Sequence, residues 1–250
     1  RSGCVPVAVH RGISLRRTSL VDYPGKVAAV IFFPGCNLRC PWCHNAALVD
    51  PSIPDAPENG GSDPRVDVDE AIAFLRKRRS VLGGVVLSGG EPLLRNDLGE
   101  VIARIGELDL PVKIDTNGTL PDRLESLLAR PETAPDYVAV DLKLAPARYA
   151  EIGGGDAETS LRRCADALRA AGTAHEFRSV ALPGGAFGEA DLRALVPIAR
   201  DSPWYFAPFS PGSCLDPLWN SYPPTARADA EALAAAARHL GASGAAVRGH

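Results

Sequence analysis

Short apolar runs alternate with amphipathic segments along most of the chain. Continuous apolar runs of strand length predict buried strands, and apolar residues three or four positions apart predict helices that bury one face. The predicted strands are residues 27–33, 84–88, 111–115, 137–142, 176–181 and 204–208. The predicted helices are residues 66–79, 96–108, 122–128, 159–171, 189–200 and 225–240. The sequence therefore predicts six consecutive βα units.

This order of elements favours a parallel sheet covered by helices. Strands buried on both faces read as near-continuous apolar runs, and crossover helices connect them. Eight units would close a full barrel, whereas this chain has six. We therefore predict an α/β fold, a partial (βα)6 TIM-like barrel that forms a single domain over 1–250 with no separate second domain. The lead-in 1–26 is expected to be extended, and the proline-rich segment 51–64 to be a loop.

Composition and charge narrow the class of protein. The chain carries 27 Lys and Arg against 30 Asp and Glu, a formal net charge of -3, so it offers no strong positive field to a polyanion. Sequence-independent binding to nucleic acid is therefore disfavoured. The longest apolar run, 27–33, is far shorter than the ~20 residues that a membrane-spanning helix needs. We expect a cytoplasmic protein that binds neither nucleic acid nor a membrane.

Three of the six cysteines, Cys36, Cys40 and Cys43, lie within eight residues. Clustered thiols in a domain of this size indicate metal or redox chemistry rather than disulfides. Structural zinc takes four closed ligands, so a zinc-stabilised binding module, with His44 as the fourth ligand, stays open as the non-enzyme alternative. An iron-sulfur cube on three thiolates instead leaves one iron free for an exogenous ligand. The spacing favours this second interpretation.

Further polar clusters follow the predicted strands. In parallel sheets covered by helices, functional residues gather at the carboxyl ends of the strands, so these clusters are expected to meet on one rim. The clusters are the cysteine loop 34–45, Gly89-Gly90-Glu91 after the second strand, Asp115-Thr116-Asn117 after the third, and Asp141 with Lys143 at the end of the fourth.

Two motifs together resemble the radical S-adenosylmethionine (SAM) superfamily. They are Cys36-x3-Cys40-x2-Cys43, with the aromatic Trp42 before the last cysteine, and Gly89-Gly90-Glu91-Pro92. In that family the three cysteines carry a 4Fe-4S cluster that chelates SAM, and reductive cleavage of SAM yields a 5'-deoxyadenosyl radical that abstracts hydrogen from the substrate. The resemblance implies both cofactors for this chain.

The resemblance also assigns roles at the cofactor site. Trp42 would lie beside the adenine, Glu91 would take the methionyl ammonium, and Lys143 would neutralise the carboxylate. Gly89 and Gly90 would let backbone approach the methionyl part, because glycine has no Cβ. The resemblance further implies that the methionyl end is bound, directly or through a monovalent cation, by Asp115, Thr116 and Asp141. Other expected cofactor contacts are His44, Asn45, Asn117, Arg178 and Ser210. For Arg178, an ion pair in the core is an equally open alternative. Ser210 stands where some activating enzymes have a histidine.

One branch of the family fits best. The continuation Cys43-His44-Asn45, together with segments 115–118 and 141–143, is similar to activating enzymes of glycyl radical enzymes. The implied partner is a glycyl radical enzyme, most specifically anaerobic ribonucleotide reductase, because segments 18–25 and 204–212 resemble its activating proteins. Flavodoxin or ferredoxin is implied as electron donor.

Two other substrate classes stay open with the same cofactors. One is a small molecule, as for 7-carboxy-7-deazaguanine synthase, and the other is a peptide. Cys43-His-Asn in place of Cys-Asp-Thr speaks against the first. Cys214 follows the sixth strand, where it could donate a hydrogen atom or a ligand, or be an ordinary thiol.

Overall fold

The structure is a computed structural model that describes residues 12–49 and 65–248. Its centre is an eight-stranded sheet in which strands follow one another in chain order. Strand β1 pairs antiparallel with β2, and every later pair is parallel. The strands are β1 Ser14–Ser19, β2 Ala28–Phe33, β3 Gly84–Gly89, β4 Val112–Thr116, β5 Tyr137–Asp141, β6 Ala174–Ala181, β7 Trp204–Pro208 and β8 Ala245–Val247.

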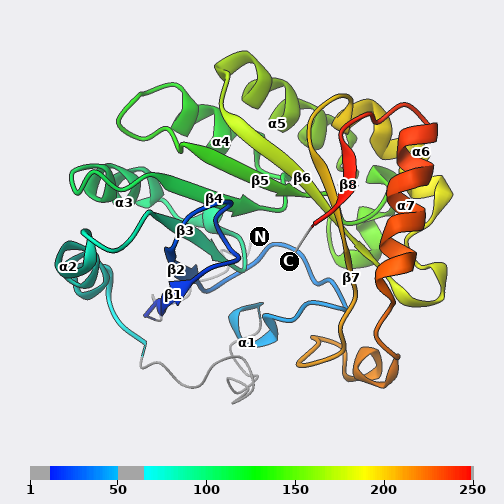
Figure 1. The fold of residues 1–250 in the computed structure, drawn as a ribbon, viewed down its shortest axis with the longest axis horizontal. Coiled ribbons are helices and arrows are strands. Elements are labelled where there is room, and N and C mark those ends of the chain that lie inside the picture. The colour runs from blue at the N-terminus through cyan, green and yellow to red at the C-terminus, as the bar shows by residue number, and fades with distance from the viewer. Residues whose placement is uncertain (1–11, 50–64, 249–250) are drawn as a thin grey trace, which may run out of the picture.

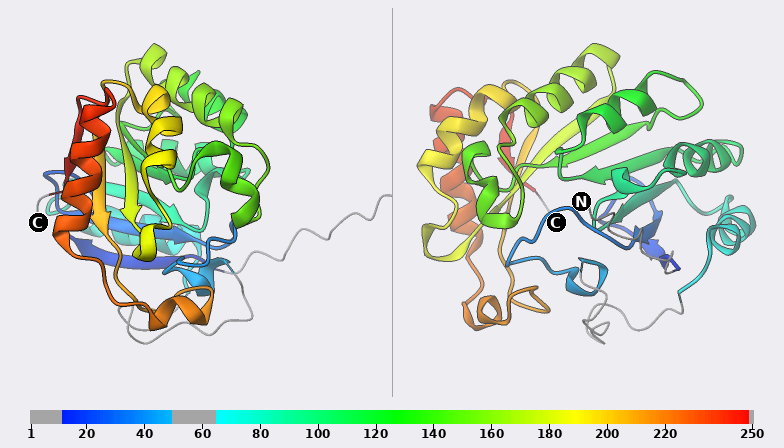
Figure 2. Two further views of the ribbon diagram at one scale, coloured as in Figure 1. Left: turned by 90° about the vertical axis from the view of Figure 1, so that its right-hand side faces the viewer. Right: turned by 180° about the vertical axis from the view of Figure 1, so that it is seen from behind.

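Helices α2 to α7 lie along the outer side of the curved sheet, and the opposite views show the parallel strands side by side beneath them (Figures 1 and 2). None of the helices in the described residues is long and apolar enough to cross a membrane. The α-helices are α1 Ala46–Val49, α2 Val68–Arg78, α3 Leu98–Gly106, α4 Pro121–Leu128, α5 Glu158–Ala171, α6 Glu189–Ala199 and α7 Arg227–His239. Short 3-10 helices are η2 Pro92–Leu94, η3 Pro146–Ile152, η4 Pro183–Gly185 and η5 Pro217–Ser221.

The predicted α/β partial barrel is confirmed, with a correction to the number of strands. All six predicted strands and helices are present, but β1 and β8 extend the sheet to eight strands. β1 lies within the extended lead-in, and it pairs with β2. β8 is only three residues long, too short for a recognisable apolar run. The predicted loop at 51–64 and the first part of the lead-in lie outside the described residues.

Strand β2 shows how alternation builds two packed faces. Ala29, Ile31 and Phe33 belong to the large core between the sheet and the helices, whereas Ala28 and Val30 pack in a smaller cluster on the opposite, concave face. This division follows from the two-residue period of a strand. The concave face carries charged residues on the neighbouring strands β4 to β6, so its lining is only partly apolar.

The start of α2 is fixed by a reciprocal cap. Asp67 Oδ1 accepts a hydrogen bond of 2.7 Å from Glu70 N, and Glu70 Oε2 accepts one of 3.0 Å from Asp67 N. Such a capping box satisfies two backbone donors that a helix N-terminus otherwise leaves without partners. It fixes the residue at which α2, a helix of the connection between β2 and β3, begins.

Candidate functional site

The loop 34–45 leaves the carboxyl end of β2 and carries the three clustered cysteines. Its backbone is hydrogen-bonded to α1, which follows it directly, and to two distant parts of the chain, and these bonds hold it in one conformation. The bonds are Gly35 N to Leu48 O (2.7 Å), Arg39 N to Ile152 O (2.7 Å), Leu215 N to Cys43 O (3.0 Å) and Asp216 N to Pro41 O (2.9 Å).

The three thiols share one neighbourhood. Cys40 is buried, and Cys36 and Cys43 are half-buried. Burial raises the pKa of Cys40 to about 12, and the nearby thiols of Cys43 and Cys36 also raise it. The positive charge of Lys143 acts in the opposite direction. Within residues 12–49 and 65–248, no three His, Cys, Asp or Glu side chains are close enough together to hold a single metal ion.

This arrangement fits an iron-sulfur cube better than one zinc ion. Zinc at Zn–S distances of ~2.3 Å brings its thiolates to within about 4 Å of one another. In a 4Fe-4S cube each thiolate binds a different iron, so the sulfurs stand further apart. Since the described part of the chain offers these three thiols no fourth closed ligand, one metal position is left open. The donor set of Cys36, Cys40 and Cys43 therefore suits a cluster with one free iron.

Gly89 and Gly90 bring the end of β3 directly against this loop. A Cβ on Gly89, whose φ is +125°, would stand 2.2 Å from Phe33 O, and one on Gly90 would stand 2.1 Å from Gly35 O. Gly90 N donates to Phe33 O at 2.9 Å. Both glycines are therefore required for the packing of two backbone segments. Their predicted approach to the cofactor stays a prediction.

Glu91 is buried at this junction, with its carboxylate held by protein donors. Oε1 accepts from Leu93 N at 3.1 Å and from the Thr116 hydroxyl at 2.8 Å, and Oε2 accepts from Asn117 N at 2.7 Å. Burial raises its pKa to about 7, although these three donors act in the opposite direction. Glu91 therefore ties the end of β3 to the end of β4, and its contact with a methionyl ammonium stays a prediction.

Two side chains that the sequence analysis did not select extend this network to the cysteine loop. Asn37 Nδ2 donates to the Thr119 hydroxyl at 2.8 Å, and Asn117 Nδ2 donates to Asn37 Oδ1 at 2.9 Å. Asn117 Oδ1 in turn accepts from Thr119 N at 3.0 Å. The loop that carries the cysteines is thereby bonded to the loop after β4. Nothing in the sequence marked Asn37, since its partner stands 80 residues away.

Five charged side chains from β4, β5 and β6 and the segment after β5 form one group on the concave face, which we call the lumen charge group. Its members are Lys113, Asp115, Asp141, Lys143 and Arg178.

Asp141 links two cations of this group, as Arg178 Nε donates to its Oδ1 at 2.7 Å and Lys143 Nζ to its Oδ2 at 3.3 Å. Burial raises the pKa of Asp141, but the charges of Arg178 and Lys143 outweigh it and hold the pKa below its usual range. Arg178 thus forms an ion pair in the core, which was the alternative to a cofactor contact in the prediction from sequence. Its contact with a cofactor stays a prediction.

Aromatic side chains gather beside the cysteine loop. The Trp42 ring is buried against Trp219, with centroids 5.2 Å apart, and the His44 ring lies 5.9 Å from that of Phe209. Burial lowers the pKa of His44. Trp42 therefore has a packing role, and its predicted position beside an adenine stays a prediction.

The remaining predicted residues lie on the same rim. Asn45 Nδ2 approaches Gly89 O at 3.4 Å, and Ser210 is exposed just after β7. Cys214 is buried, and because the next residue, Leu215, donates its N–H to Cys43 O, this thiol lies beside the cysteine loop.

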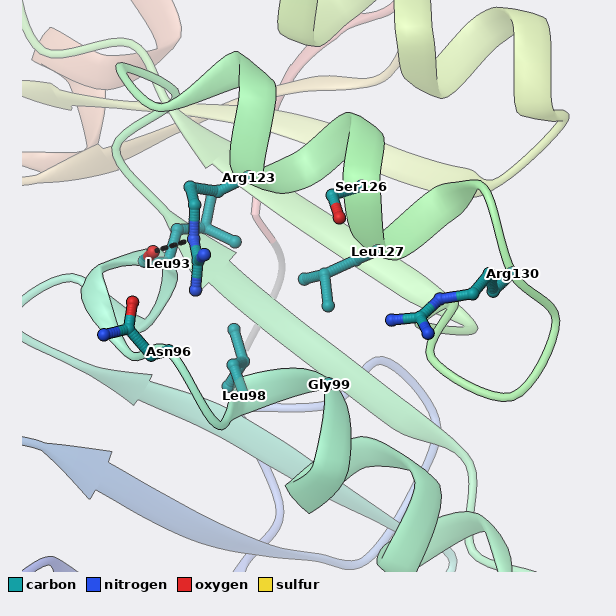
Figure 3. Close-up of a pocket in the computed structure, with 8 residues that line it drawn as sticks. All are labelled: Leu93, Asn96, Leu98, Gly99, Arg123, Ser126, Leu127 and Arg130. Atoms are coloured by element: carbon teal, nitrogen blue, oxygen red, sulfur yellow. Dashed lines mark hydrogen bonds between the residues drawn. The ribbon is translucent and has the colours of Figure 1, made fainter.

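A separate cavity of about 70 Å³ lies on the outer side, between α4 and the segment that leads into α3 (Figure 3). Arg123 borders it and donates through Nε to Leu93 O at 3.2 Å. No residue of the loop 34–45 lines this cavity, so it is distinct from the rim. Its lining is Leu93, Asn96, Leu98, Gly99, Arg123, Ser126, Leu127 and Arg130.

Comparison with known proteins finds a matching family model and several relatives of this chain. The family model described as "Radical SAM superfamily" matches residues 30–192. A Methanocaldococcus jannaschii protein that carries the provisional name glycyl-radical enzyme activating enzyme is 31% identical over 212 residues, which cover 82% of each chain. The pyruvate formate-lyase-activating enzyme of Clostridium pasteurianum is 32% identical over 135 residues, or 52% of this chain and 51% of that protein.

Two further comparisons concern another curated relative and a solved structure. The 7-carboxy-7-deazaguanine synthase of Methanopyrus kandleri is 30% identical over 141 residues, or 49% of this chain and 51% of that protein. A radical SAM methyltransferase of Sphaerobacter thermophilus has the same fold, with a TM-score of 0.62 at 16% identity over 95% of this chain and 77% of its own. On the family match, the relatives and the shared fold, this chain belongs to the radical SAM superfamily.

Proposed function

We propose that this radical SAM enzyme cleaves SAM reductively and installs a glycyl radical on a partner enzyme. The observation that carries the proposal is the hydrogen-bonded loop that presents Cys36, Cys40 and Cys43 beside the lumen charge group. Support for the glycyl radical branch comes from the M. jannaschii relative, which matches over 82% of both chains.

Cys36, Cys40 and Cys43 would hold one 4Fe-4S cluster and leave its fourth iron for the amino and carboxylate groups of SAM. When bound, the cluster supplies one electron that breaks a C–S bond of the SAM sulfonium, giving methionine and the hydrogen-abstracting 5'-deoxyadenosyl group. Lys143, half-buried beside the cysteines, would pair with the carboxylate of SAM. The protein's part is to position the cofactor and to exclude other reactions.

The other rim residues would complete the cofactor site. Trp42 would border the adenine, while Glu91 keeps the loops after β3 and β4 together. The glycines at 89 and 90 fix the distance between β3 and the cysteine loop. Residues proposed as further contacts are His44, Asn45, Asp115, Thr116, Asn117, Asp141, Arg178 and Ser210.

The partner would present a glycine at the rim, where removal of one hydrogen from its Cα leaves a radical delocalised over the amide and carbonyl groups. Anaerobic ribonucleotide reductase is the partner we propose, with flavodoxin or ferredoxin as the electron donor. These partners and a cluster on thiolates are compatible with a reducing, cytoplasmic location.

The test is anaerobic reconstitution with iron and sulfide, followed by reduction in the presence of SAM. We expect cluster absorption, one 5'-deoxyadenosine per cleaved SAM, and a glycyl radical signal in electron paramagnetic resonance when the reductase is added. Cys40→Ala should lose the cluster. Cys164→Ala is the matched control, because that thiol is buried in α5, donates to Gly118 O at 3.2 Å and does not belong to the loop 34–45.

Each step of this assay has an outcome that contradicts the proposal. A fully loaded cluster that yields no 5'-deoxyadenosine would exclude SAM cleavage. Cleavage without a radical on the reductase would exclude that partner. Formation of 7-carboxy-7-deazaguanine by the enzyme would favour the small-molecule alternative, which the M. kandleri relative supports.

A further inference from the structure

Lys113 is a charged side chain placed entirely inside the protein. It is the second residue of β4, and its side chain is 0% exposed. Val112 and Ile114 on either side pack toward the helices, so Lys113 and Asp115 point to the concave face. There the ammonium of Lys113 is paired with Asp115 Oδ1. A buried ammonium is costly unless it is paired, so its presence at this position calls for a specific role.

The net charge of the lumen charge group disfavours the binding of another cation. It contains the carboxylates of Asp115 and Asp141 and three cations, Lys113, Lys143 and Arg178. The neighbouring buried carboxylate of Glu176 on β6 is paired with Arg248, so the net charge is already positive. Adding a metal cation would place a further positive charge among them.

The oxygens of the group are also engaged. Asp115 Oδ1 faces Lys113 Nζ and, at 3.4 Å, a guanidinium nitrogen of Arg178, while its Oδ2 accepts from the Ser88 hydroxyl at 3.2 Å. Both oxygens of Asp141 accept from cations. The Thr116 hydroxyl donates to Glu91 and accepts from Gly118 N at 3.1 Å.

The residues that the family resemblance assigns to a monovalent cation therefore do not fit one here. Asp115 and Asp141 are neutralised from within the protein, and Thr116 is turned to a different partner. The cation that the resemblance implies beside Asp115 and Asp141 stays a prediction, and these contacts disfavour it.

We propose that the ammonium of Lys113 takes the place of this cation and positions Asp115 from inside the barrel. Through Asp115 it also orients Arg178, which bonds Asp141, so the strand ends of β4, β5 and β6 are held by one continuous chain of ion pairs. The surplus positive charge of the group suits one anionic ligand group rather than a metal ion. This inference goes beyond the proposed function and does not rest on it.

The test follows thermal unfolding of the metal-free protein in sodium chloride, potassium chloride and N-methyl-D-glucamine chloride at equal ionic strength. We expect the wild type to have the same Tm in all three. Lys113→Met keeps the length of the side chain but removes the charge, so it should have a lower Tm. An alkali ion should then enter beside Asp115, and at about ten times its Kd it would raise the Tm by roughly 3–5 °C relative to the organic cation.

Two control variants separate this effect from general salt effects. Arg104→Met removes a cation from an outer ion pair with the exposed Asp69, and it should show no difference between alkali and organic cations. Lys113→Met combined with Asp115→Asn removes both charges, so it should lose the alkali preference that the single variant gains. A merely structural lysine would lower the Tm equally in all three salts.

A measurement on the wild type alone covers the case in which Lys113→Met does not fold. In a sodium chloride solution, the wild-type protein should not broaden the 23Na resonance in a way that added potassium reverses. Potassium-reversible broadening, or a wild-type Tm that is higher in alkali salts, would overturn the proposal. So would a folded Lys113→Met variant without alkali preference. None of these outcomes depends on whether a glycyl radical forms.

Discussion

Glu91 and Thr116 are joined by a hydrogen bond of 2.8 Å that connects the carboxyl ends of two neighbouring parallel strands, β3 and β4. The carboxylate is only 1% exposed, so it depends on protein donors. Because a buried carboxylate that loses its donors is strongly destabilising, these strand ends are held together. The contact continues to the cysteine loop through Glu91 N, which donates to Gly35 O at 2.8 Å, and through Asn37. The rim is therefore one connected network.

Glu91 should give the metal-free protein a characteristic pH dependence. Burial raises its pKa from 4.5 to about 7, so near pH 6 the folded protein holds a proton that the unfolded chain has released. The free energy of unfolding contributed by this group therefore falls as the pH rises from about 5 to about 7.5, by ~1–3 kcal/mol. Glu91→Gln should lack this part of the slope. Urea unfolding of both proteins at several pH values measures it, and parallel curves would contradict the assignment.

Asp141 should act in the opposite sense, in a more acidic range. Its pKa is held below the ordinary value by Arg178 and Lys143, so its stabilising contribution is present above about pH 4 and is lost as the pH falls further. Asp141→Asn should lower the free energy of unfolding by ~1–3 kcal/mol at pH 7, since it leaves two cations facing each other, and by less near pH 3. Acid unfolding curves test this, and an equal loss at both pH values would count against it.

Gly90→Ala should damage the junction between β3 and the cysteine loop. The added Cβ would stand 2.1 Å from Gly35 O, a backbone atom that moves only with the loop. We expect a loss of ~2–4 kcal/mol and poor cluster incorporation. Gly106→Ala is the matched control, because no atom lies within 4 Å of its Cβ position at the end of α3. That control should be neutral or more stable, by up to ~1 kcal/mol. Equal Tm values for the two variants would refute the packing argument.

Asn37→Ala should loosen the cysteine loop without removing a cysteine. The substitution removes the bonds to Thr119 and Asn117, at a cost of ~1–2 kcal/mol. The reconstituted cluster should then be lost faster to a chelator, which visible absorption follows over time. Asn96→Ala, an exposed residue on the outer side, serves as control. Unchanged loss rates in Asn37→Ala would show that these bonds do not retain the cluster.

The sequence by itself determined the succession of elements. Apolar runs such as 27–33 and 137–142 predict strands because a strand buried on both faces needs apolar residues on both. The position of the polar clusters at the ends of these runs was enough to predict one rim. Cys36, Cys40 and Cys43 were recognisable because all three stand within one short loop, so their chemistry depends on local spacing.

Only the tertiary structure decided which polar residues meet. Arg178 stands 63 positions after Asp115, and it reaches that carboxylate because β4, β5 and β6 follow one another in the sheet. Lys113, by contrast, is only two positions from Asp115 on the same strand. Whether a carboxylate is free for a ligand or neutralised by cations depends on contacts between strands, such as those of Arg178 with Asp115 and Asp141. Such contacts are set by sheet order and register, which no local pattern encodes. For that reason the sequence shows Asp115 and Asp141 as candidate ligands, whereas only the fold shows that Arg178 bridges the two carboxylates.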